Sequence, residues 1–226
     1  MSNILVLFDI DETLIDSGKA GSRALNSAFY ELFGIRDAFR DIKMAGMTDI
    51  QIMKEGLMMH GLLSDSGEVE VLMYKYLDHL SHEINNPWKY IKPGVLEILD
   101  TLTWDAVPLG LLTGNLEAGA DIKLASFDLR KYFSDGAFGS DHEDRNMLLP
   151  IAVKKFSQIG INTTYEKCVV IGDTPRDVMC AKIYNAHSIG VATGPYSKAD
   201  LEEAGADLVL EDLADKAVCL EYINSI

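Results

Sequence analysis

The sequence contains 226 residues, of which 48% are hydrophobic, 24% charged and 8% aromatic, and this near-average composition excludes disorder, collagen-like repetition and low complexity. Its formal net charge is -15, from 20 Lys and Arg against 35 Asp and Glu, which argues against binding to nucleic acid or to anionic membranes. The length fits one compact domain with a large insertion, and the charge favours a small substrate or a protein partner.

The cysteines and the apolar runs indicate the compartment. Cys168, Cys180 and Cys219 form no CxxC pair, which argues against a disulfide framework and a zinc knuckle. The first apolar run, residues 4–8, is too short for a signal peptide, and no run approaches the roughly 20 apolar residues of a membrane span. We therefore expect a cytoplasmic protein that does not contact a membrane.

Strand and helix patterns alternate along most of the chain. The apolar run at 4–8 ends at acidic residues, which is typical of a central strand in a parallel sheet covered on both faces. Similar runs predict strands at 108–112, 168–171, 188–191 and 207–210. Helices are predicted at 95–102, 117–127, 146–159, 176–184, 198–203 and 213–223. The alternation predicts an α/β fold with a doubly wound, Rossmann-like parallel sheet.

The segment between about residues 17 and 88 breaks this rhythm. Apolar residues recur there at helical spacing, and no convincing strand is present. We therefore predict a catalytic α/β core made of residues 1–15 and 90–226. Residues 16–89 are predicted to form an inserted, all-helical cap domain.

Polar side chains follow three of the predicted strands, namely Asp9 and Asp11, Thr113-Gly114-Asn115, and Asp173 with Asp177. The carboxyl ends of parallel strands share one edge, where open α/β sheets bind ligands. A carboxylate near its unperturbed pKa of about 4 is ionised at neutral pH, so Asp9 is the candidate nucleophile for an attack on phosphorus. The four acids would repel one another and a phosphate, which predicts a hard divalent cation, Mg²⁺, among them.

The motifs DIDET at 9–13, TGN at 113–115 and GDTPRD at 172–177 resemble those of the haloacid dehalogenase superfamily of phosphohydrolases, in the group whose helical cap follows the first motif. The likeness covers essentially the whole chain. AFYELFGI at 28–35, GMTD at 46–49 and KPGV at 92–95 are similar to the phosphoglycolate phosphatase branch. The resemblance implies that Mg²⁺ is bound by the side chains of Asp9 and Asp173 and by the backbone carbonyl of Asp11, with Asp177 nearby or acting through water.

Asp11 distinguishes two chemistries within this superfamily. Its dehalogenating members lack an acid at this position, so Asp11 favours phosphoryl over carbon–halogen chemistry. We expect Asp11 to protonate the leaving-group oxygen and later to take a proton from the attacking water. Thr113, Gly114 and Asn115 are expected to donate hydrogen bonds near the phosphate, and Thr113 also fits a helix N-cap.

The Lys-Pro stretch that usually forms the third motif is missing, and residues 139–146 (GSDHEDRN) stand in its place. Arg145 and the pair Lys154/Lys155 are the candidate replacements. A helix that begins near Asn146 runs away from the catalytic edge, so Lys154 would lie about 12 Å along its axis. Arg145, at the first turn, is therefore the expected catalytic cation, and a surface ion pair is its alternative role.

Together these features predict a Mg²⁺-dependent phosphatase that hydrolyses a small phosphorylated metabolite through an aspartyl-phosphate, with the cap closing over the substrate. Met47 and Thr48 are candidate substrate-binding residues of the cap. A phosphomutase or a phosphonate-cleaving enzyme on the same fold is the alternative. A receiver-type phospho-switch is about half this length and has no use for Asp11, and the intact motifs argue against a decayed, non-catalytic scaffold.

Overall fold

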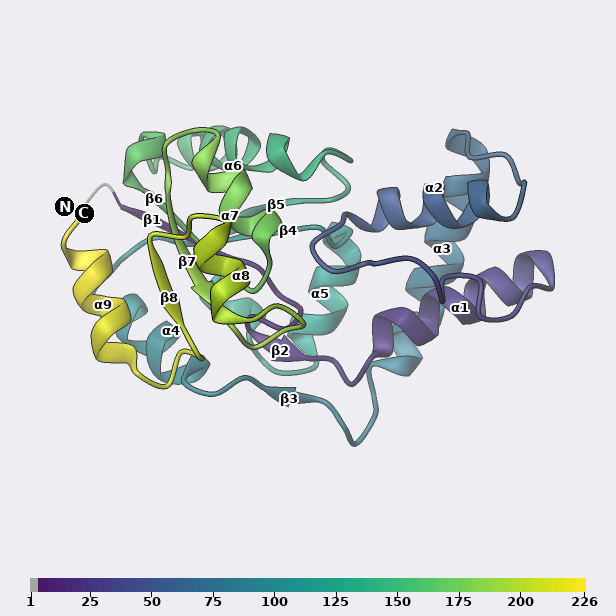
Figure 1. Cartoon of the computed structure of the whole chain (residues 1–226), viewed down its shortest axis with the longest axis horizontal. Coiled ribbons are helices and arrows are strands. Elements are labelled where there is room, and N and C mark those ends of the chain that lie inside the picture. The colour runs from purple at the N-terminus through teal and green to yellow at the C-terminus, as the bar shows by residue number, and fades with distance from the viewer. Residues whose placement is uncertain (1–3) are drawn as a thin grey trace.

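The computed structural model describes residues 4–226 and contains a six-stranded parallel sheet in the order β5-β4-β1-β6-β7-β8 (Figure 1). The strands are β1 (Leu5–Phe8), β4 (Leu109–Thr113), β5 (Asp135–Phe138), β6 (Cys168–Gly172), β7 (His187–Val191) and β8 (Leu208–Leu210). Strand β1 lies between β4 and β6, with Leu7 paired to Gly110 on one side and to Val170 on the other. The predicted doubly wound α/β fold is confirmed.

Helices cover both faces of the sheet, and the side chains of β1 alternate between the two layers. Val6 and Phe8 pack in the apolar cluster that includes residues of α4 (Val95–Trp104), α5 (Glu117–Ala125) and α9 (Lys216–Asn224). Leu5 and Leu7 pack in the cluster of α6 (Leu148–Gln158) and α7 (Pro175–Lys182). This period-two burial is what a strand between two helical layers requires. The other helices of this part are α8 (Lys198–Glu203) and the 3-10 helices η1 (Arg130–Tyr132), η2 (Arg145–Met147) and η3 (Tyr165–Lys167).

A separate helical lobe follows the first strand and lies beside the carboxyl edge of the sheet (Figure 1). It consists of α1 (Ala20–Phe33), α2 (Asp49–Met59) and α3 (Ser66–Glu83), which share their own apolar cluster around Phe29, Met53 and Leu72. A short antiparallel ribbon, β2 (Ile15–Asp16) paired with β3 (Tyr90–Ile91), connects this cap to the core. The predicted limits of the cap domain, residues 16 and 89, lie in or next to this ribbon. The division into two domains at these residues stays a prediction.

Among the differences from the sequence-based expectation, three concern the elements of the core: β5, α6 and α9. The pattern does not predict β5, because its sequence DGAF contains residues that rarely form strands and pairs with β4 only in the folded sheet. The helix expected at 146–159 is preceded by the tighter turn η2 and begins as an α-helix at Leu148. The last helix begins at Lys216 rather than at 213, since the Asp212 side chain accepts a hydrogen bond from Ala214 N in a turn.

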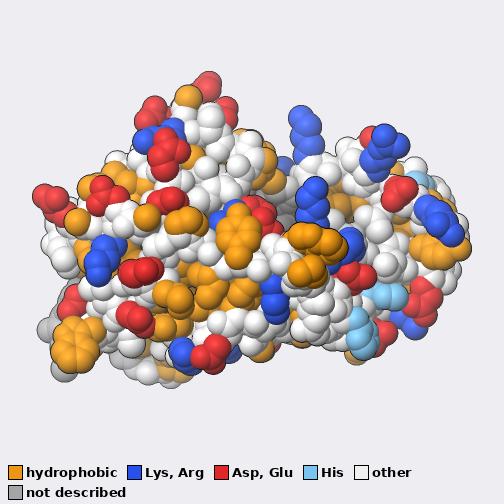
Figure 2. All heavy atoms as spheres, turned by 90° about the horizontal axis from the view of Figure 1, so that it is seen from below, with side chains coloured by type: hydrophobic (Ala, Val, Ile, Leu, Met, Phe, Trp, Pro, Cys, Tyr) orange, Lys and Arg blue, Asp and Glu red, His pale blue; other side chains and the backbone are white. Residues whose placement is uncertain are grey.

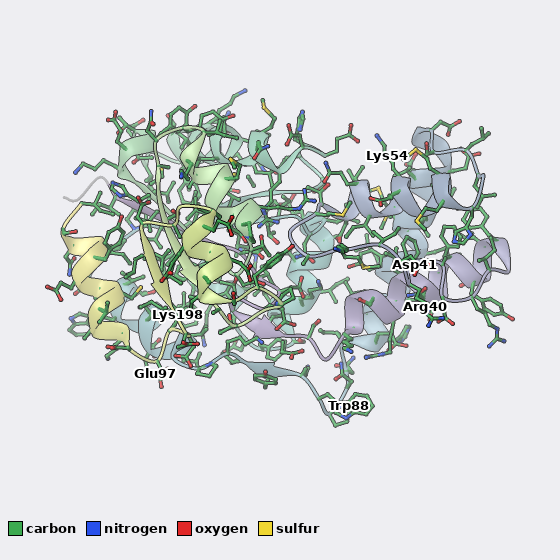
Figure 3. The ribbon with its side chains drawn as sticks, in the orientation of Figure 1. Arg40, Asp41, Lys54, Trp88, Glu97 and Lys198 are labelled. Atoms are coloured by element: carbon green, nitrogen blue, oxygen red, sulfur yellow. The ribbon has the colours of Figure 1, made fainter. Side chains whose placement is uncertain are left out.

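The surface carries charges of both signs. On the face shown in Figure 2, Asp and Glu side chains are spread among Lys and Arg side chains over both lobes. Trp88 projects outward from the loop between α3 and β3 and is 67% exposed (Figure 3). Among residues 4–226, no helix has the length and apolar character needed to cross a bilayer.

The sheet should not tolerate a side chain at Gly110 in the middle of β4. A Cβ atom there would lie 2.5 Å from Phe156 Cζ and 2.8 Å from Leu7 Cδ2, both deep in the core. We expect Gly110→Ala to destabilise the fold by about 1–3 kcal/mol, which corresponds to a melting-temperature loss of roughly 2–12 °C.

Gly67→Ala is the matched control for this substitution. Gly67 lies exposed in α3, and the nearest atom to an added Cβ, Asp65 Oδ1, is 3.4 Å away. Because alanine favours helix, this variant should be neutral or slightly stabilising. Equal melting temperatures for the two variants would contradict the packing described for β4.

Candidate active site

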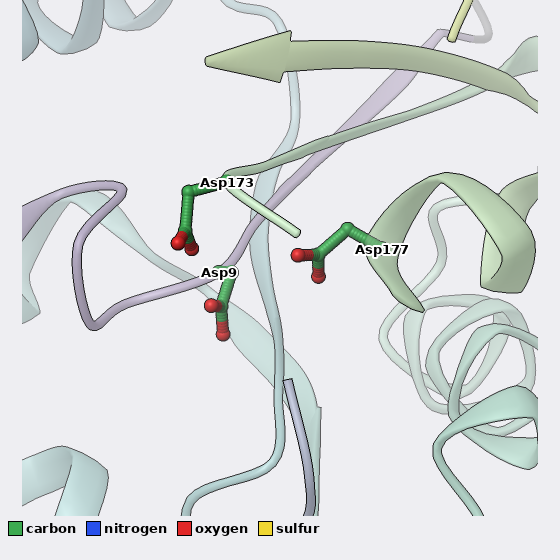
Figure 4. A group of neighbouring side chains, drawn as sticks. All are labelled: Asp9, Asp173 and Asp177. Atoms are coloured by element: carbon green, nitrogen blue, oxygen red, sulfur yellow. The ribbon is translucent and has the colours of Figure 1, made fainter. Parts of the chain in front are cut away.

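Three acidic side chains lie together at the carboxyl edge of the sheet. Asp9 follows β1, Asp173 follows β6, and Asp177 belongs to the first turn of α7 (Figure 4). One carboxylate oxygen from each lies within 4.8 Å of the other two, and none of the three residues is more than 6% exposed. The structure therefore brings together three of the acids that the sequence places after strands.

The negative charge of this group is poorly compensated. Burial raises the pKa of Asp9, Arg145 opposes that rise, and Asp177 and Asp11 add to it. Burial also raises the pKa of Asp173 far above its ordinary value, and repulsion from Asp177 and Asp9 increases the effect. Ionising these carboxylates in the protein alone is unfavourable, so the group fits a bound cation.

The donor atoms match a hard divalent cation such as Mg²⁺, which prefers carboxylate oxygens. Asp177 has both oxygens occupied: Oδ2 accepts hydrogen bonds from Thr174 N (3.0 Å) and Thr174 Oγ1 (2.7 Å), and Oδ1 pairs with Arg145. This leaves Asp9 and Asp173 as the side chains expected to bind the ion. Asp177 would then act beside it, as the resemblance implies.

Arg145 lies at the start of η2 and is only 5% exposed. Its Nη2 is 3.1 Å from Asp9 Oδ1 and also pairs with Asp177. Burial disfavours the guanidinium charge, but Asp177 and Asp9 outweigh burial and raise the pKa of Arg145 above its ordinary value. Lys154 is exposed and Lys155 forms an ion pair elsewhere, so Arg145 is the cation that the structure places beside Asp9.

Asp11 belongs to a second hydrogen-bonded group on the cap side of Asp9. Asn115 Nδ2 donates to Asp11 Oδ2 (2.9 Å) and to Thr113 Oγ1 (2.9 Å), and Lys123 Nζ lies 2.5 Å from the same Asp11 oxygen. Burial alone would raise the pKa of Asp11, but Lys123, Asn115 and a Ser17 hydrogen bond outweigh it and hold that pKa below its ordinary value. Asp9 and Asp11 therefore have different surroundings, and their pKa values are shifted in opposite directions.

Lys123 is a site residue that the sequence motifs do not identify. It lies in α5 and is 3% exposed, on the buried helix face that also carries Gly119, Ala120 and Leu124. Burial opposes its charge, yet Asp11 and Asp49 raise the pKa of Lys123 above its ordinary value. The signal in the sequence is a lysine on the apolar stripe of a helix that directly follows a motif.

The cap contacts the TGN motif directly. Asp49 N donates to Gly114 O (2.8 Å), and Leu116 N donates to Asp49 Oδ2 (2.9 Å). A Cβ atom at Gly114 would collide with the carbonyl group of Met47, so glycine is needed for this approach. Burial raises the pKa of Asp49 to about 6. Asp49 is thus a second site residue that the sequence does not identify as one, although it ends the GMTD stretch.

Thr48 has a structural role at the contact between the cap and the core. Its hydroxyl donates to Glu143 O (2.8 Å) and accepts a hydrogen bond from Gln51 N as the N-cap of α2. Thr48 is fully buried and does not line the cavity, whereas Met47 does. This threonine is used as a helix cap and as a contact to the core. Substrate binding by Met47 and Thr48 stays a prediction, and only Met47 lines the cavity.

A cavity of about 210 Å³ lies between the core and the cap. Its floor contains the catalytic candidates, and its cap side contains polar groups and an apolar wall. The lining residues that concern the chemistry are Asp9, Asp11, Thr113, Gly114, Asn115, Arg145, Asp173, Lys123, Asp49, Tyr76, Met47, Leu25 and Ile52. The cavity suits a small substrate whose phosphate lies on the core side.

Comparison with known proteins agrees with this geometry. The model of the haloacid dehalogenase-like hydrolase family matches residues 6–191. The chain is 22% identical to a phosphoglycolate phosphatase of Agrobacterium fabrum, over 93% of this chain and 89% of that protein. It is 25% identical to a phosphoglycolate phosphatase of Salmonella typhi, over 84% of this chain and 81% of that protein.

Solved structures share the fold. A hydrolase from Pseudomonas syringae superposes with a TM-score of 0.75 at 26% identity, covering 97% of this chain and 99% of that one. CbbY from Rhodobacter sphaeroides, solved in complex with phosphate, gives a TM-score of 0.75 at 17% identity, covering 93% of this chain and 95% of that one. The second likeness concerns the fold alone.

Arg145 should be far more important for activity than the lysines of α6. We expect Arg145→Ala to lower kcat/KM by about 100-fold or more, because removal of one preorganised charged donor typically costs that much. Lys154→Ala removes an exposed side chain and should change kcat/KM little. Both variants are compared after their thermal unfolding shows that they are folded. The reverse ranking would return the role to the helix lysines.

Mg²⁺ should stabilise the protein, and more at pH 8 than at pH 5. The pKa values of Asp9 and Asp173 in the folded protein are raised above the ordinary 3.8. The stability that these two carboxyl groups contribute is therefore present at low pH, and it is lost as the pH rises through their pKa values in the folded protein. A cation that binds the ionised carboxylates removes this loss. At 100 times its Kd it contributes about 2.7 kcal/mol, or roughly 5–10 °C in melting temperature.

Asp173→Asn provides the control for this measurement. The variant lacks one anionic ligand, so both the Mg²⁺ shift and the metal-free pH dependence should decrease. Thermal unfolding with EDTA or Mg²⁺ at the two pH values measures both effects. A Mg²⁺ shift of wild-type size in Asp173→Asn, or a larger shift at pH 5, would contradict the assignment.

Proposed function

This chain belongs to the haloacid dehalogenase-like hydrolases and is a phosphoric monoester hydrolase, and we propose that it is a Mg²⁺-dependent phosphatase that acts on a small phosphorylated metabolite through an aspartyl-phosphate. The observation that carries the proposal is that Asp9, Asp11, Asp173 and Arg145 line one cavity at the carboxyl edge of the sheet. Asp9 lies among acids and Arg145, where a cation would balance the charge of the acids and of a bound phosphate, while Asp11 is paired with Lys123 and lines the same cavity.

In the first step, a carboxylate oxygen of Asp9 attacks phosphorus, and the bond between phosphorus and the ester oxygen breaks. Asp11 donates a proton to that ester oxygen, so the organic group leaves as an alcohol. In this proposal Arg145, Thr113 and Gly114 hold phosphate oxygens, while Asn115 Nδ2 stays bonded to Asp11 and Thr113. The product of this step is a phosphoryl group on Asp9.

In the second step, Asp11, now ionised, takes a proton from water while the water oxygen attacks phosphorus. The bond from phosphorus to Asp9 breaks, phosphate leaves, and both carboxyl groups return to their starting forms. Asp9 and Asp173 would hold Mg²⁺. When bound, the ion would neutralise charge on the phosphoryl group. Atoms and protons balance over the two steps, as hydrolysis requires.

The substrate is proposed to be a short phosphate ester, as in phosphoglycolate phosphatases. The cavity of about 210 Å³ favours a leaving group of a few heavy atoms. The curated relatives at 22–25% identity are phosphoglycolate phosphatases, which makes phosphoglycolate the first compound to test. A cytoplasmic location fits such a substrate and stays a prediction.

Asp9→Asn should abolish phosphate release while the fold remains intact, because it removes the nucleophilic charge at nearly constant volume. Asp11→Asn should slow both steps but retain more activity on 4-nitrophenyl phosphate than on phenyl phosphate, since nitrophenolate leaves without protonation. Phosphate release with and without EDTA measures turnover, and mass spectrometry after acid quenching detects phosphorylated Asp9. Metal-independent turnover, or near wild-type activity of Asp9→Asn, would exclude the mechanism.

A further inference from the structure

We propose that Lys123 is a positioning residue for Asp11, whose carboxylate it fixes through Oδ2 so that Oδ1 is presented to the leaving group and to the attacking water. The inference rests on the proposed function, because it assumes that Asp11 transfers a proton. It adds to that function a residue from α5, outside the three motifs on which the family resemblance is based.

The contacts form a closed ring of three side chains. Lys123 Nζ lies 2.5 Å from Asp11 Oδ2 and 2.5 Å from Asn115 Oδ1, and Asn115 Nδ2 donates to the same Asp11 oxygen at 2.9 Å. Asn115 is itself held by its hydrogen bond to Thr113 Oγ1. Two donors thus converge on one oxygen of Asp11. A carboxylate held in this way cannot exchange its two oxygens by rotating about the bond to Cβ without breaking both contacts.

Asp11 needs such an anchor more than Asp9 does. The Asp11 side chain is 37% exposed and faces the cavity, whereas that of Asp9 is 8% exposed and enclosed by its neighbours. An unrestrained side chain at the cavity wall would populate several rotamers, and only some of them would reach the ester oxygen. Proton transfer is efficient only when the acid is held within hydrogen-bond distance of that oxygen.

Lys123 is placed so that its ammonium group stays in position. Lys123 is 3% exposed. Its Nζ lies 3.5 Å from the point that a Cβ atom would occupy if Gly21 of α1 had a side chain. The hydroxyl of Tyr76, from α3, lies 3.6 Å from the same point. The ammonium group therefore lies where helices of the cap meet α5 of the core. An ammonium in such a place costs desolvation energy that an apolar side chain avoids, so stability alone does not account for it.

The test compares kcat and KM of Lys123→Met on phenyl phosphate and 4-nitrophenyl phosphate, two probes of similar shape with different leaving groups. Methionine keeps the length of the side chain and removes its charge. We expect kcat on phenyl phosphate to fall about tenfold to 100-fold, with a much smaller loss on 4-nitrophenyl phosphate and KM nearly unchanged. Lys131→Met, which removes an exposed lysine paired with Asp128, is the matched control and should have no effect.

A double-mutant cycle separates a positioning role from a structural one. If Lys123 acts through Asp11, then Lys123→Met in the Asp11→Asn background should cause no further loss of kcat. The inference would be overturned if the losses of kcat from the two substitutions multiplied in the double variant. Equal losses on both probes, or a rise in KM alone, would overturn it as well. Failure of the proposed function has a different signature, since the wild-type protein would then release no phosphate from either probe.

A second variant covers the case in which Lys123→Met does not fold. Lys123→Cys can be alkylated with 2-bromoethylamine, which restores an ammonium group at the length of lysine. The three native cysteines are 0% exposed and do not line the cavity, whereas residue 123 does, so only the introduced cysteine should react in the folded protein. Alkylation should recover most of the lost kcat on phenyl phosphate. A modified protein that stays as slow as the unmodified variant would refute the positioning role.

Discussion

The charge balance at one edge of the sheet determines how this molecule works. Five carboxylates, those of Asp9, Asp11, Asp49, Asp173 and Asp177, lie in or beside a small cavity, and two buried cations divide them into groups. Arg145 is paired with Asp9 and Asp177, and Lys123 with Asp11. The first group has three carboxylates for one cation, an excess of negative charge that a divalent cation would balance, while in the second group Lys123 faces two carboxylates, Asp11 and Asp49.

Each cation comes from the structural element that brings it to its own acid. Arg145 belongs to η2, which follows β5 and precedes α6, and it approaches Asp9 from the core. Lys123 is near the end of α5, where the buried helix face meets the cap. Because the two cations belong to different segments, the charge next to Asp9 and the charge next to Asp11 are set independently.

The strand ends are predictable from the sequence because an apolar run followed by a polar residue has one simple explanation in a parallel sheet. The rise of an α-helix per residue likewise favours Arg145 over Lys154, since only the first turn of that helix lies near the catalytic edge. By contrast, β5 has weak strand propensity and forms through pairing with β4. Lys123 and Asp49 are not predictable, because their roles depend on where α5 and α2 lie, and neither position follows from local spacing.

The position of Ile10 explains how Asp9 and Asp11 come to line the same cavity. Side chains alternate direction where β1 ends, and Ile10, which is 0% exposed, packs into the core between the two acids. Asp9 therefore faces Arg145 and the carboxylates after β6 and in α7, while Asp11 lies one step further out, within reach of α5 and the cap. The alternation thus turns both carboxylates toward the same cavity, and the step along the chain from Asp9 to Asp11 decides which cation each of them meets.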